Sequence, residues 1–335
     1  MPTAKTLYFT APQNVEVRNA EMRFPKENEV LVQTICSAIS AGTEMLVYCG
    51  EFPTLADTHD NLSSNLKYPT TYGYACVGKV IECGSKVEKT WKDKLVFSFQ
   101  PHTSHFISTP ESLFTIPESI SPDNACFFPN METAVNLVQD GAPILGERVL
   151  VIGQGVVGLL TTSLLNEFPL ETLCTLDRYE LRRDASKNID NVTLLDNSED
   201  VDVPSFAYAQ NNKFDLTFEL SGSPSALNDS IQLTRFNGRI VIGSWYGQKR
   251  AEIDFGGVFH RSRIKLISSQ VSTISPELSG RWDKSRRFEA AWKALERIQP
   301  KKWITHRFNI DDAEKAYQLL SENPQETIQV IFDYL

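Results

Sequence analysis

Three glycines near the middle of the chain have the spacing of a phosphate-binding turn. In the letters VLVIGQGVVG, a run of aliphatic residues ends in Gly153, Gly155 and Gly158. In a G-x-G-x-x-G turn the first glycine permits a tight turn, the second lets a pyrophosphate approach the backbone, and the third lets helix and strand pack closely. The unpaired N–H groups that open the next helix, with Val156 and Val157 in its first turn, would face the phosphates. The segment therefore predicts a dinucleotide site.

An acidic residue follows these glycines at the distance that such a site requires. Asp177 comes directly after the short apolar segment 172–176, roughly 20 residues beyond the turn. A carboxylate there accepts hydrogen bonds from both ribose hydroxyls of NAD and repels a 2′-phosphate. Arg178, Arg182 and Arg183 follow, and they could hold a 2′-phosphate, stack on the adenine or stay solvated. We expect Asp177 and Arg178 to contact the cofactor and NAD(H) to be preferred to NADP(H). The alternative for Asp177 is a helix N-cap or a surface loop residue.

Length and composition describe an ordinary globular protein. The chain has 335 residues, of which 41% are hydrophobic and 22% charged, and its formal charge is −9. This length is enough for two domains with separate cores, and the negative charge argues against nucleic acid or an anionic membrane as partner. No apolar run reaches the roughly 18 residues of a membrane span, and the cysteines form no C-x-x-C pair. We expect a cytoplasmic protein with reduced thiols.

Alternating strand and helix patterns run from about residue 149 to 268. Apolar strand-like segments recur there with helical segments between several of them, which is the rhythm of a doubly wound parallel sheet. The part before them is rich in short strands, and the end of the chain returns to helix and strand. We therefore expect an α/β fold in which a Rossmann domain of residues 130–272 is inserted in a β-rich domain formed by 1–129 and 273–335. The active site is expected in the cleft between them, at the carboxyl ends of the strands.

Motifs spread over nearly the whole chain resemble those of the medium-chain dehydrogenase/reductase superfamily. The matching segments are GKVIECGSKV at 78–87, ELSGSP at 219–224, GRIVIG at 238–243 and ITHRF at 304–308. The resemblance implies a GroES-like catalytic domain, a nicotinamide cofactor, a small-molecule substrate and a homodimer. It also implies cofactor contacts from Ser221 and Gly222, near the nicotinamide ribose, and from Gly243 and Ser244 after the fifth strand.

A narrower resemblance concerns one branch of that superfamily. The segment ISAGTE at 39–44, followed by Tyr48 and Gly50, is similar to the branch that includes the bacteriochlorophyllide dehydrogenase of pigment synthesis. The pair Pro101-His102, followed by Phe106, is similar to it as well. This resemblance implies membership of the branch and does not by itself predict a porphyrin substrate.

The ligands of the zinc-dependent relatives are missing from this chain. Where those relatives have a C-G-x-D segment, this chain has Ala41 in place of the cysteine, and their G-H-E is replaced by Gly-Tyr-Ala around Tyr74. Pro129 stands near the position of a late cysteine ligand. Zinc requires three or four Cys, His or carboxylate ligands, and Glu44 alone cannot hold it. The four-cysteine structural lobe is also absent, so we expect no zinc of either kind.

Without a metal, the alkoxide that develops during hydride transfer must meet a hydrogen-bond or proton donor. Tyr74 stands at the position of the lost histidine ligand, and its hydroxyl could act as a general acid; the alternative is that it only fills the metal void. Glu44 could orient Tyr74, a substrate hydroxyl or the ribose, or hold a backbone group or an arginine. Thr133 matches a threonine that touches the nicotinamide in relatives. His102 and His105 could reach the cleft, although a lone histidine is more often structural.

These observations favour one function and leave two alternatives open. The favoured function is a zinc-independent NAD(P)(H)-dependent oxidoreductase that transfers a hydride between the nicotinamide and a small alcohol or carbonyl compound. The first alternative is a reductase of an activated C=C bond, such as an enone or enoyl group, since zinc-free relatives often have that activity. The second is a catalytically inactive NAD(H)-binding sensor or scaffold, which would account for the loss of every metal ligand.

Overall fold

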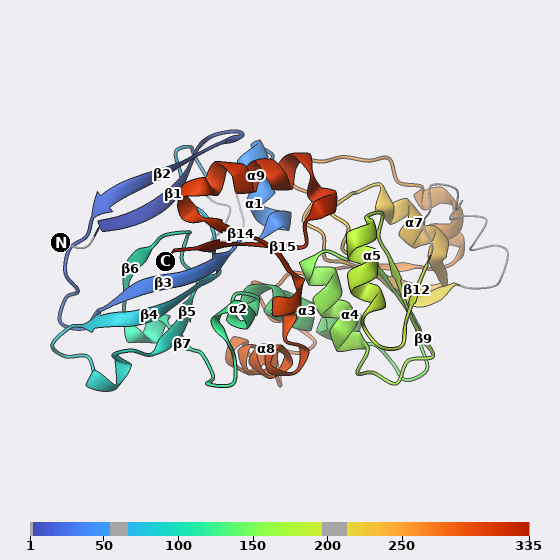
Figure 1. Ribbon diagram of the computed structural model, residues 1–335. Helices are drawn as coiled ribbons and strands as arrows, with labels where there is room; N and C mark the ends of the chain where they lie inside the picture. Colours follow the sequence, from blue (N-terminus) through green and yellow to red (C-terminus); the bar gives the residue numbers. More distant parts are fainter. Residues whose placement is uncertain (1–2, 54–65, 196–212, 335) are drawn as a thin grey trace. The chain divides into compact units, whose positions relative to one another are not determined.

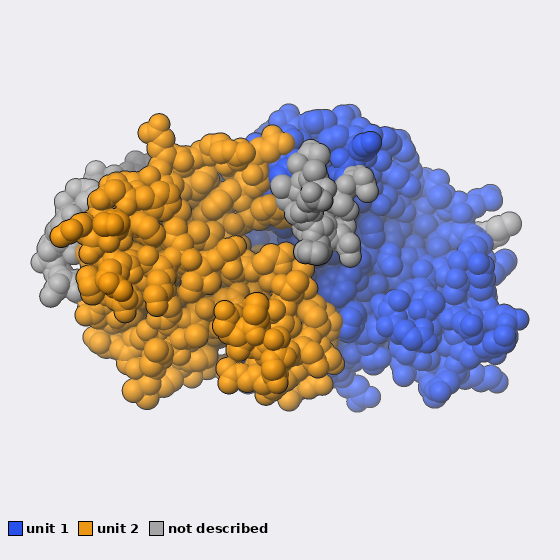
Figure 2. Space-filling model, turned by 180° about the vertical axis from the view of Figure 1, so that it is seen from behind, with its two compact units in different colours: residues 1–129, 295–335 blue, residues 130–294 orange. Residues whose placement is uncertain are grey.

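The computed structural model describes residues 3–53, 66–195 and 213–334, and the chain divides into two compact units. Unit 1 consists of residues 1–129 and 295–335, and unit 2 of residues 130–294 (Figure 2). The chain leaves unit 1 within α3 (Phe128–Gly141) and returns to it within α8 (Lys284–Ile298).

The segment 273–294 belongs to unit 2, whereas the sequence analysis assigned it to the other domain. A buried ion pair provides the physical reason. Arg287 of α8 is fully buried and donates hydrogen bonds to Glu132 and Asn136 of α3 and to the carbonyl of Thr273. Because a buried guanidinium is stable only with all its donors satisfied, these bonds fix α8 to the first helix of unit 2.

The core of unit 2 is a parallel sheet of six strands (Figure 1). Every adjacent pair is parallel, and the order is β10-β9-β8-β11-β12-β13. The strands are β8 (Arg148–Ile152), β9 (Thr172–Leu176), β10 (Val192–Leu194), β11 (Phe214–Glu219), β12 (Thr234–Ile242) and β13 (Lys265–Ser268). This is the strand order of a Rossmann sheet, whose direction of winding reverses between β8 and β11. The predicted doubly wound parallel sheet is confirmed.

Helices connect the strands of unit 2 as the apolar pattern predicts. They are α4 (Val156–Leu165), α5 (Glu180–Lys187) and α7 (Ala226–Leu233). Leu159, Leu160 and Leu165 of α4 have no exposed surface, because the helix packs on the equally buried β8. The strongly polar α5 has only Ser186 buried, so it covers the sheet with one narrow face.

Unit 1 is built on a mixed sheet in the order β14-β15-β3-β4-β5-β7, with β6 paired to β3. Its strands are β3 (Val30–Ala38), β4 (Cys76–Cys83), β5 (Leu95–Ser98), β6 (His105–Ser108), β7 (Phe114–Thr115), β14 (Ile304–Asn309) and β15 (Gln329–Asp333). A hairpin of β1 (Thr3–Ala11) and β2 (Asn14–Glu21) lies beside it. Both ends of the chain contribute to this unit, since β15 pairs antiparallel with β3.

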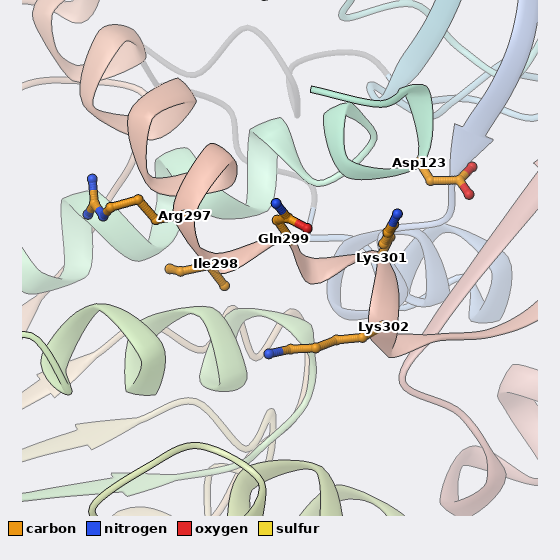
Figure 3. Close-up of a pocket in the computed structure, with 6 residues that line it drawn as sticks. All are labelled: Asp123, Arg297, Ile298, Gln299, Lys301 and Lys302. Carbon is orange, nitrogen blue, oxygen red and sulfur yellow. The ribbon is translucent and has the colours of Figure 1, made fainter. Parts of the chain in front are cut away.

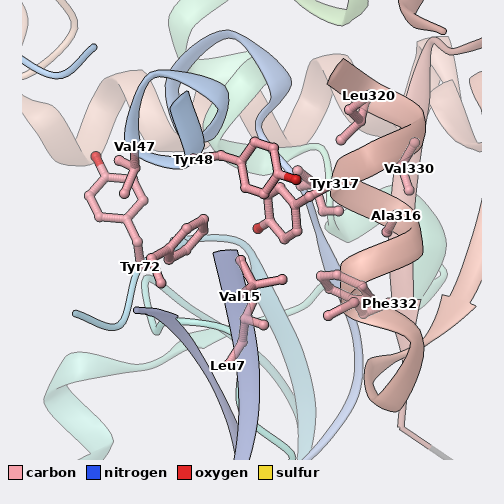
Figure 4. Close-up of a cluster of buried hydrophobic side chains, with 13 residues drawn as sticks. Leu7, Val15, Val47, Tyr48, Tyr72, Ala316, Tyr317, Leu320, Val330 and Phe332 are labelled. Atoms are coloured by element: carbon pink, nitrogen blue, oxygen red, sulfur yellow. The ribbon is translucent and has the colours of Figure 1, made fainter. Parts of the chain in front are cut away.

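Two helices of unit 1 close an apolar core between the hairpin and the sheet. They are α1 (Ala41–Cys49) and α9 (Ala313–Glu322), while the short α2 (Pro122–Ala125) precedes α3. Tyr48 of α1 stacks on Tyr317 of α9 with ring centroids 5.3 Å apart, and Phe332 of β15 lies in the same cluster (Figure 4). This core holds α1, which carries the predicted site residue Glu44. Within the described ranges, no helix has the length and apolar character needed to cross a membrane.

Candidate functional site

The first and third glycines of the turn lie where a side chain would clash with the backbone. Gly153 has φ +91°, and a Cβ there would lie 2.5 Å from the carbonyl oxygen of Leu220. Gly155 is the N-cap of α4, and a Cβ at Gly158 would lie 1.9 Å from the carbonyl oxygen of Gly153. The first and third glycines are therefore required by the fold. Val156 and Val157 begin the first turn of α4, so the N-terminus of this helix, which attracts anions, lies at Gly155.

The residues predicted to bind the cofactor follow four neighbouring strands that end at the same edge of the sheet. Ile152 of β8 is in register with Leu176 of β9 and with Glu219 of β11. Glu219 is in turn in register with Ile242 of β12. The residues that come directly after these strands are Gly153, Asp177, Leu220 and Gly243. The carboxyl edge of unit 2 thus brings together the glycine turn, Asp177 and both loops implied by the family resemblance.

Asp177 is connected directly to the glycine turn. Its Oδ2 accepts a hydrogen bond from the backbone N–H of Gln154 at 2.6 Å, and its Oδ1 accepts one from the N–H of Tyr179 at 2.8 Å. The residue is only 7% exposed. Each carboxylate oxygen can accept a second hydrogen bond, so the carboxylate is oriented by the backbone and retains acceptor capacity for hydroxyl groups.

Two arginines lie beside this carboxylate. The guanidinium carbons of Arg178 and Arg182 lie 4.5 and 4.8 Å from the ring centroid of Tyr179. A Cβ on Gly155 would be 3.8 Å from a guanidinium nitrogen of Arg182, which places that charge next to the turn. Burial lowers the pKa of Arg182, but an arginine side chain keeps its charge in proteins. Positive charge therefore adjoins the place where the turn would hold a phosphate.

Glu219 holds together the two loops that follow β11 and β12 at the carboxyl edge of the sheet. It is fully buried and accepts hydrogen bonds from the N–H and the hydroxyl of Ser221 and, at 2.5 Å, from the hydroxyl of Tyr246. Burial and the charge of Glu219 together raise the pKa of Tyr246 strongly. The N–H of Gly222 donates to Ser244 Oγ at 2.9 Å, which joins the loops a second time.

The sequence predicts four residues of these loops but not the pair Glu219 and Tyr246. The predicted positions, Ser221, Gly222, Gly243 and Ser244, all lie in the two joined loops. Gly243 is also required by packing, since a Cβ there would lie 2.5 Å from Leu137. The role of Glu219 in holding Tyr246 was missed. The available signal was a carboxylate that ends a buried strand, where an unpaired charge is costly.

Thr133 and Tyr74 lie in different units. Thr133 is on α3 in unit 2, and its side chain is half-buried. Tyr74 lies in unit 1 just before β4, and its hydroxyl donates to Ser40 and, at 3.3 Å, to Thr43. Burial raises the pKa of Tyr74, and the nearby charge of Glu44 adds to the rise against the opposing effect of the two hydrogen bonds. The phenol therefore keeps its proton at neutral pH.

Glu44 is fully buried and makes hydrogen bonds through both of its oxygens. Oε1 accepts from the backbone N–H of Ser40 at 2.7 Å, and Oε2 accepts from the hydroxyl of Tyr317 at 2.6 Å. Oε2 also lies 2.9 Å from Nε2 of His102. Of the partners considered from the sequence, the structure shows the backbone group; its contact with Tyr74 is indirect, through Ser40.

The two candidate histidines differ in their surroundings. His102 is fully buried, with Nδ1 2.6 Å from the hydroxyl of Ser37. His105 is half-buried on β6, with Nδ1 3.1 Å from the hydroxyl of Ser104, and burial lowers its pKa. The imidazole of His105 is consequently neutral at pH 7.

The residues that the family resemblance places at a zinc site do not form a set that suits a zinc ion. Ala41 and Pro129 carry no ligand atom, the Tyr74 hydroxyl is protonated, and both oxygens of Glu44 lie within hydrogen-bond distance of other groups. Across the described ranges, no group of three or more His, Cys, Asp and Glu side chains could hold a metal ion.

A surface pocket of about 560 Å³ lies elsewhere in unit 1 (Figure 3). Its lining consists of Asp123, Arg297, Ile298, Gln299, Lys301 and Lys302. The predicted site residues belong to other segments of the chain, so this pocket has no part in the proposed chemistry.

Several known proteins that resemble this chain are dehydrogenases. L-Threonine 3-dehydrogenase of Pyrococcus abyssi is 24% identical over 95% of this chain and 94% of its own length. Among solved structures, 2R,3R-butanediol dehydrogenase of Bacillus subtilis has a TM-score of 0.79 at 18% identity and covers 99% of this chain and 100% of its own. No protein-family model matches the chain.

Two further structures contain a cofactor. An alcohol dehydrogenase of Escherichia coli CFT073 in complex with NADH has a TM-score of 0.77 at 19% identity, with 99% of both chains covered. A dehydrogenase of Sinorhizobium meliloti 1021 bound to NADP has the same score and identity and covers 99% of this chain and 100% of its own. These similarities and the two sheets described above show that the chain has the fold of the medium-chain dehydrogenase/reductase superfamily.

Proposed function

We propose that the protein is an NAD(P)(H)-dependent oxidoreductase that transfers a hydride between the nicotinamide and a small alcohol or carbonyl compound. The observation that carries the proposal is the carboxyl edge of unit 2. There, a complete glycine turn, an oriented carboxylate and two joined loops follow four strands in register. Similarity to dehydrogenases along the whole chain supports it.

We further propose a preference for NAD(H). Asp177 is fixed by two backbone N–H groups, so its charge cannot move away from a ribose that binds against the turn. A 2′-phosphate would meet that charge, whereas two free hydroxyls would donate to it. Arg178 and Arg182 stack on Tyr179, and this platform suits the adenine ring.

The proposed chemistry proceeds without zinc, with Tyr74 as the proton donor. A nicotinamide held at the carboxyl edge of unit 2 would supply the hydride for the carbonyl carbon. The electron pair of the C=O π bond would then pass to oxygen, and the role of Tyr74 is to give its hydroxyl proton to the developing alkoxide. The hydroxyls of Ser40 and Thr43 can rotate to donate to the phenolate that remains. Oxidation of the alcohol follows the same steps in reverse.

The branch resemblance noted in the sequence favours alcohol and carbonyl chemistry over reduction of a C=C bond. A fluorescence titration with NADH and NADPH, followed by assays with alcohols, ketones, enones and quinones, tests the proposal. We expect tighter binding of NADH and turnover with a carbonyl compound. Turnover confined to enones would assign C=C reduction, and tight NADH binding without turnover of any class would assign a sensor or scaffold.

Tyr74→Phe and metal analysis test the zinc-free mechanism on the same preparation. We expect the variant to lose turnover by roughly 10²–10⁴-fold while NADH binding is retained. Unchanged turnover would reject the acid role, and one bound zinc per chain in the active protein would contradict zinc independence.

A further inference from the structure

We propose that His102 is a positioning residue for Tyr74, acting through Glu44 and through the backbone before Tyr74. This inference rests on the proposed function, in which Tyr74 donates the proton. His102 lies in the loop between β5 and β6 and has no exposed surface. It contacts both structures that hold the Tyr74 ring: the start of α1 and the segment that ends at Tyr74.

The first connection runs through Glu44. The carboxylate of Glu44 accepts from the N–H of Ser40, the residue that precedes α1 and has no side-chain cap hydrogen bond of its own. A side chain that bonds back to this N–H fixes the first turn of a helix. That turn presents Ser40 and Thr43, the two hydroxyls to which Tyr74 donates.

The second connection is steric. Gly73 has φ +116°, and a Cβ there would lie 2.8 Å from Cδ2 of the His102 ring. The backbone N–H of His102 also donates to the carbonyl of Tyr72 at 3.3 Å. The imidazole therefore packs directly against the peptide that precedes Tyr74, so a smaller side chain would leave that peptide unsupported.

The proposal uses one arrangement of protons that satisfies every contact of the network. In it, Nε2 of His102, 2.9 Å from Oε2, donates to Glu44, which also accepts from Ser40 and Tyr317. Nδ1 accepts from Ser37, and Ser37 accepts from the hydroxyl of Tyr334, 2.7 Å away. Every group in this chain has a partner, which makes its geometry well defined.

The order Ser37, His102, Glu44 is also that of a hydrolase triad, but burial excludes that role. Ser37 and His102 have no exposed surface, so the hydroxyl of Ser37 cannot reach an acyl group. Tyr74 is partly exposed, as are its two hydroxyl partners Ser40 and Thr43. Tyr334, at the other end of the network, is partly exposed as well. In the proposed function, Tyr74 is the member of the network that meets a substrate.

Two substitutions of His102 separate its hydrogen bonds. His102→Gln places an amide N–H near the position of Nε2 and keeps the donation to Glu44, whereas His102→Asn places an acceptor near Nδ1 and loses that donation. We expect kcat to fall about 10–10²-fold in His102→Asn, with a small change in KM, because a displacement of about 1 Å has effects of this size. The Gln variant should recover most of the loss. His260→Asn, at an exposed histidine of unit 2, is the matched control and should leave kcat unchanged.

A double-mutant cycle with Tyr74→Phe decides whether His102 acts through Tyr74. The substrate is the carbonyl compound with the highest NADH oxidation rate in the assays above. If the inference holds, adding His102→Asn to Tyr74→Phe lowers kcat by less than about twofold, because the group that it positions is already gone. Multiplicative losses, or equal losses in the Asn and Gln variants, would overturn it.

The same cycle distinguishes this inference from the proposed function. If Tyr74→Phe alone leaves turnover unchanged, the acid role of Tyr74 fails and the inference fails with it. If Tyr74→Phe is impaired while His102→Asn is not, only the inference fails. If His102→Asn does not fold, Tyr317→Phe can be used instead, because it removes another donor to Glu44. We expect Tyr317→Phe to lower kcat in the wild-type background and to have no further effect in the Tyr74→Phe background. An unchanged kcat in Tyr317→Phe would then overturn the inference.

Discussion

The backbone N–H of Gln154, inside the glycine turn, donates to Oδ2 of Asp177 at 2.6 Å. This bond joins the glycine turn to the carboxylate that we propose holds the ribose. A carboxylate oriented by the backbone loses less entropy on binding, so in the proposed function Asp177 would contribute to affinity as well as to the preference for NAD(H).

Replacing Asp177 by Asn should weaken NADH binding and reduce the preference for NADH. The amide keeps one acceptor and turns its NH₂ group towards a backbone N–H, so one of the two backbone bonds is lost. We expect the Kd for NADH to rise about 10–100-fold, with a smaller rise for NADPH because a negative charge has been removed. Fluorescence titrations with both cofactors measure this, and equal changes for the two would count against the assigned role.

Gly158→Ala should destabilise unit 2 or displace the turn. The new methyl group would lie 1.9 Å from the carbonyl oxygen of Gly153, a backbone atom that cannot rotate away. Gly280→Ala in the same unit is the control, since a Cβ there meets nothing within 4 Å. We expect a lower Tm and loss of NADH binding in the first variant only. Normal NADH binding by Gly158→Ala would show that the turn is not as described.

The fold was largely predictable from the sequence, whereas much of the site was not. Buried parallel strands appear in the sequence as aliphatic runs such as 149–152, and the glycine spacing predicts the turn that follows. Two partners of Glu44 were not predictable, because His102 and Tyr317 come from segments far from it in the sequence. The third, the backbone N–H of Ser40, is four residues away, and a backbone partner was among those expected. A hydrogen bond that only the tertiary fold creates leaves no local pattern in the sequence.

Loss of the bond between Glu219 and Tyr246 should affect the nicotinamide end of the site. Tyr246→Phe removes the hydroxyl donor to a buried carboxylate and leaves the ring in place. We expect the Kd for NADH to rise roughly 5–50-fold, since hydrogen bonds to charged groups contribute about 1.5–3 kcal/mol and part of the loss falls on folding. Binding of ADP, which lacks the nicotinamide, is the control and should stay unchanged. An equal loss of affinity for NADH and ADP would show that the effect of the substitution is not confined to the nicotinamide end of the site.

Stability should fall in alkaline solution. Burial raises the pKa of Tyr246, Tyr317 and Tyr334 above the ordinary value of about 10. Below about pH 10 the folded and unfolded chains both keep these protons, so the contribution to stability is complete. Above it the unfolded chain releases them first, and the contribution is lost as the pH rises towards the folded values. Tm measured from pH 8 to 11 should decline above pH 10, less steeply in Tyr246→Phe. An identical slope in that variant would contradict the raised pKa of Tyr246.

The most direct test of the account follows the hydride itself. The protein is treated exhaustively with a chelator, shown by metal analysis to be free of zinc, and incubated with NADH deuterated at C4 and the preferred carbonyl compound. We predict that deuterium appears on the carbinol carbon of the alcohol product at the rate seen before chelation. Activity that disappears on chelation and returns with added zinc would contradict the central claim.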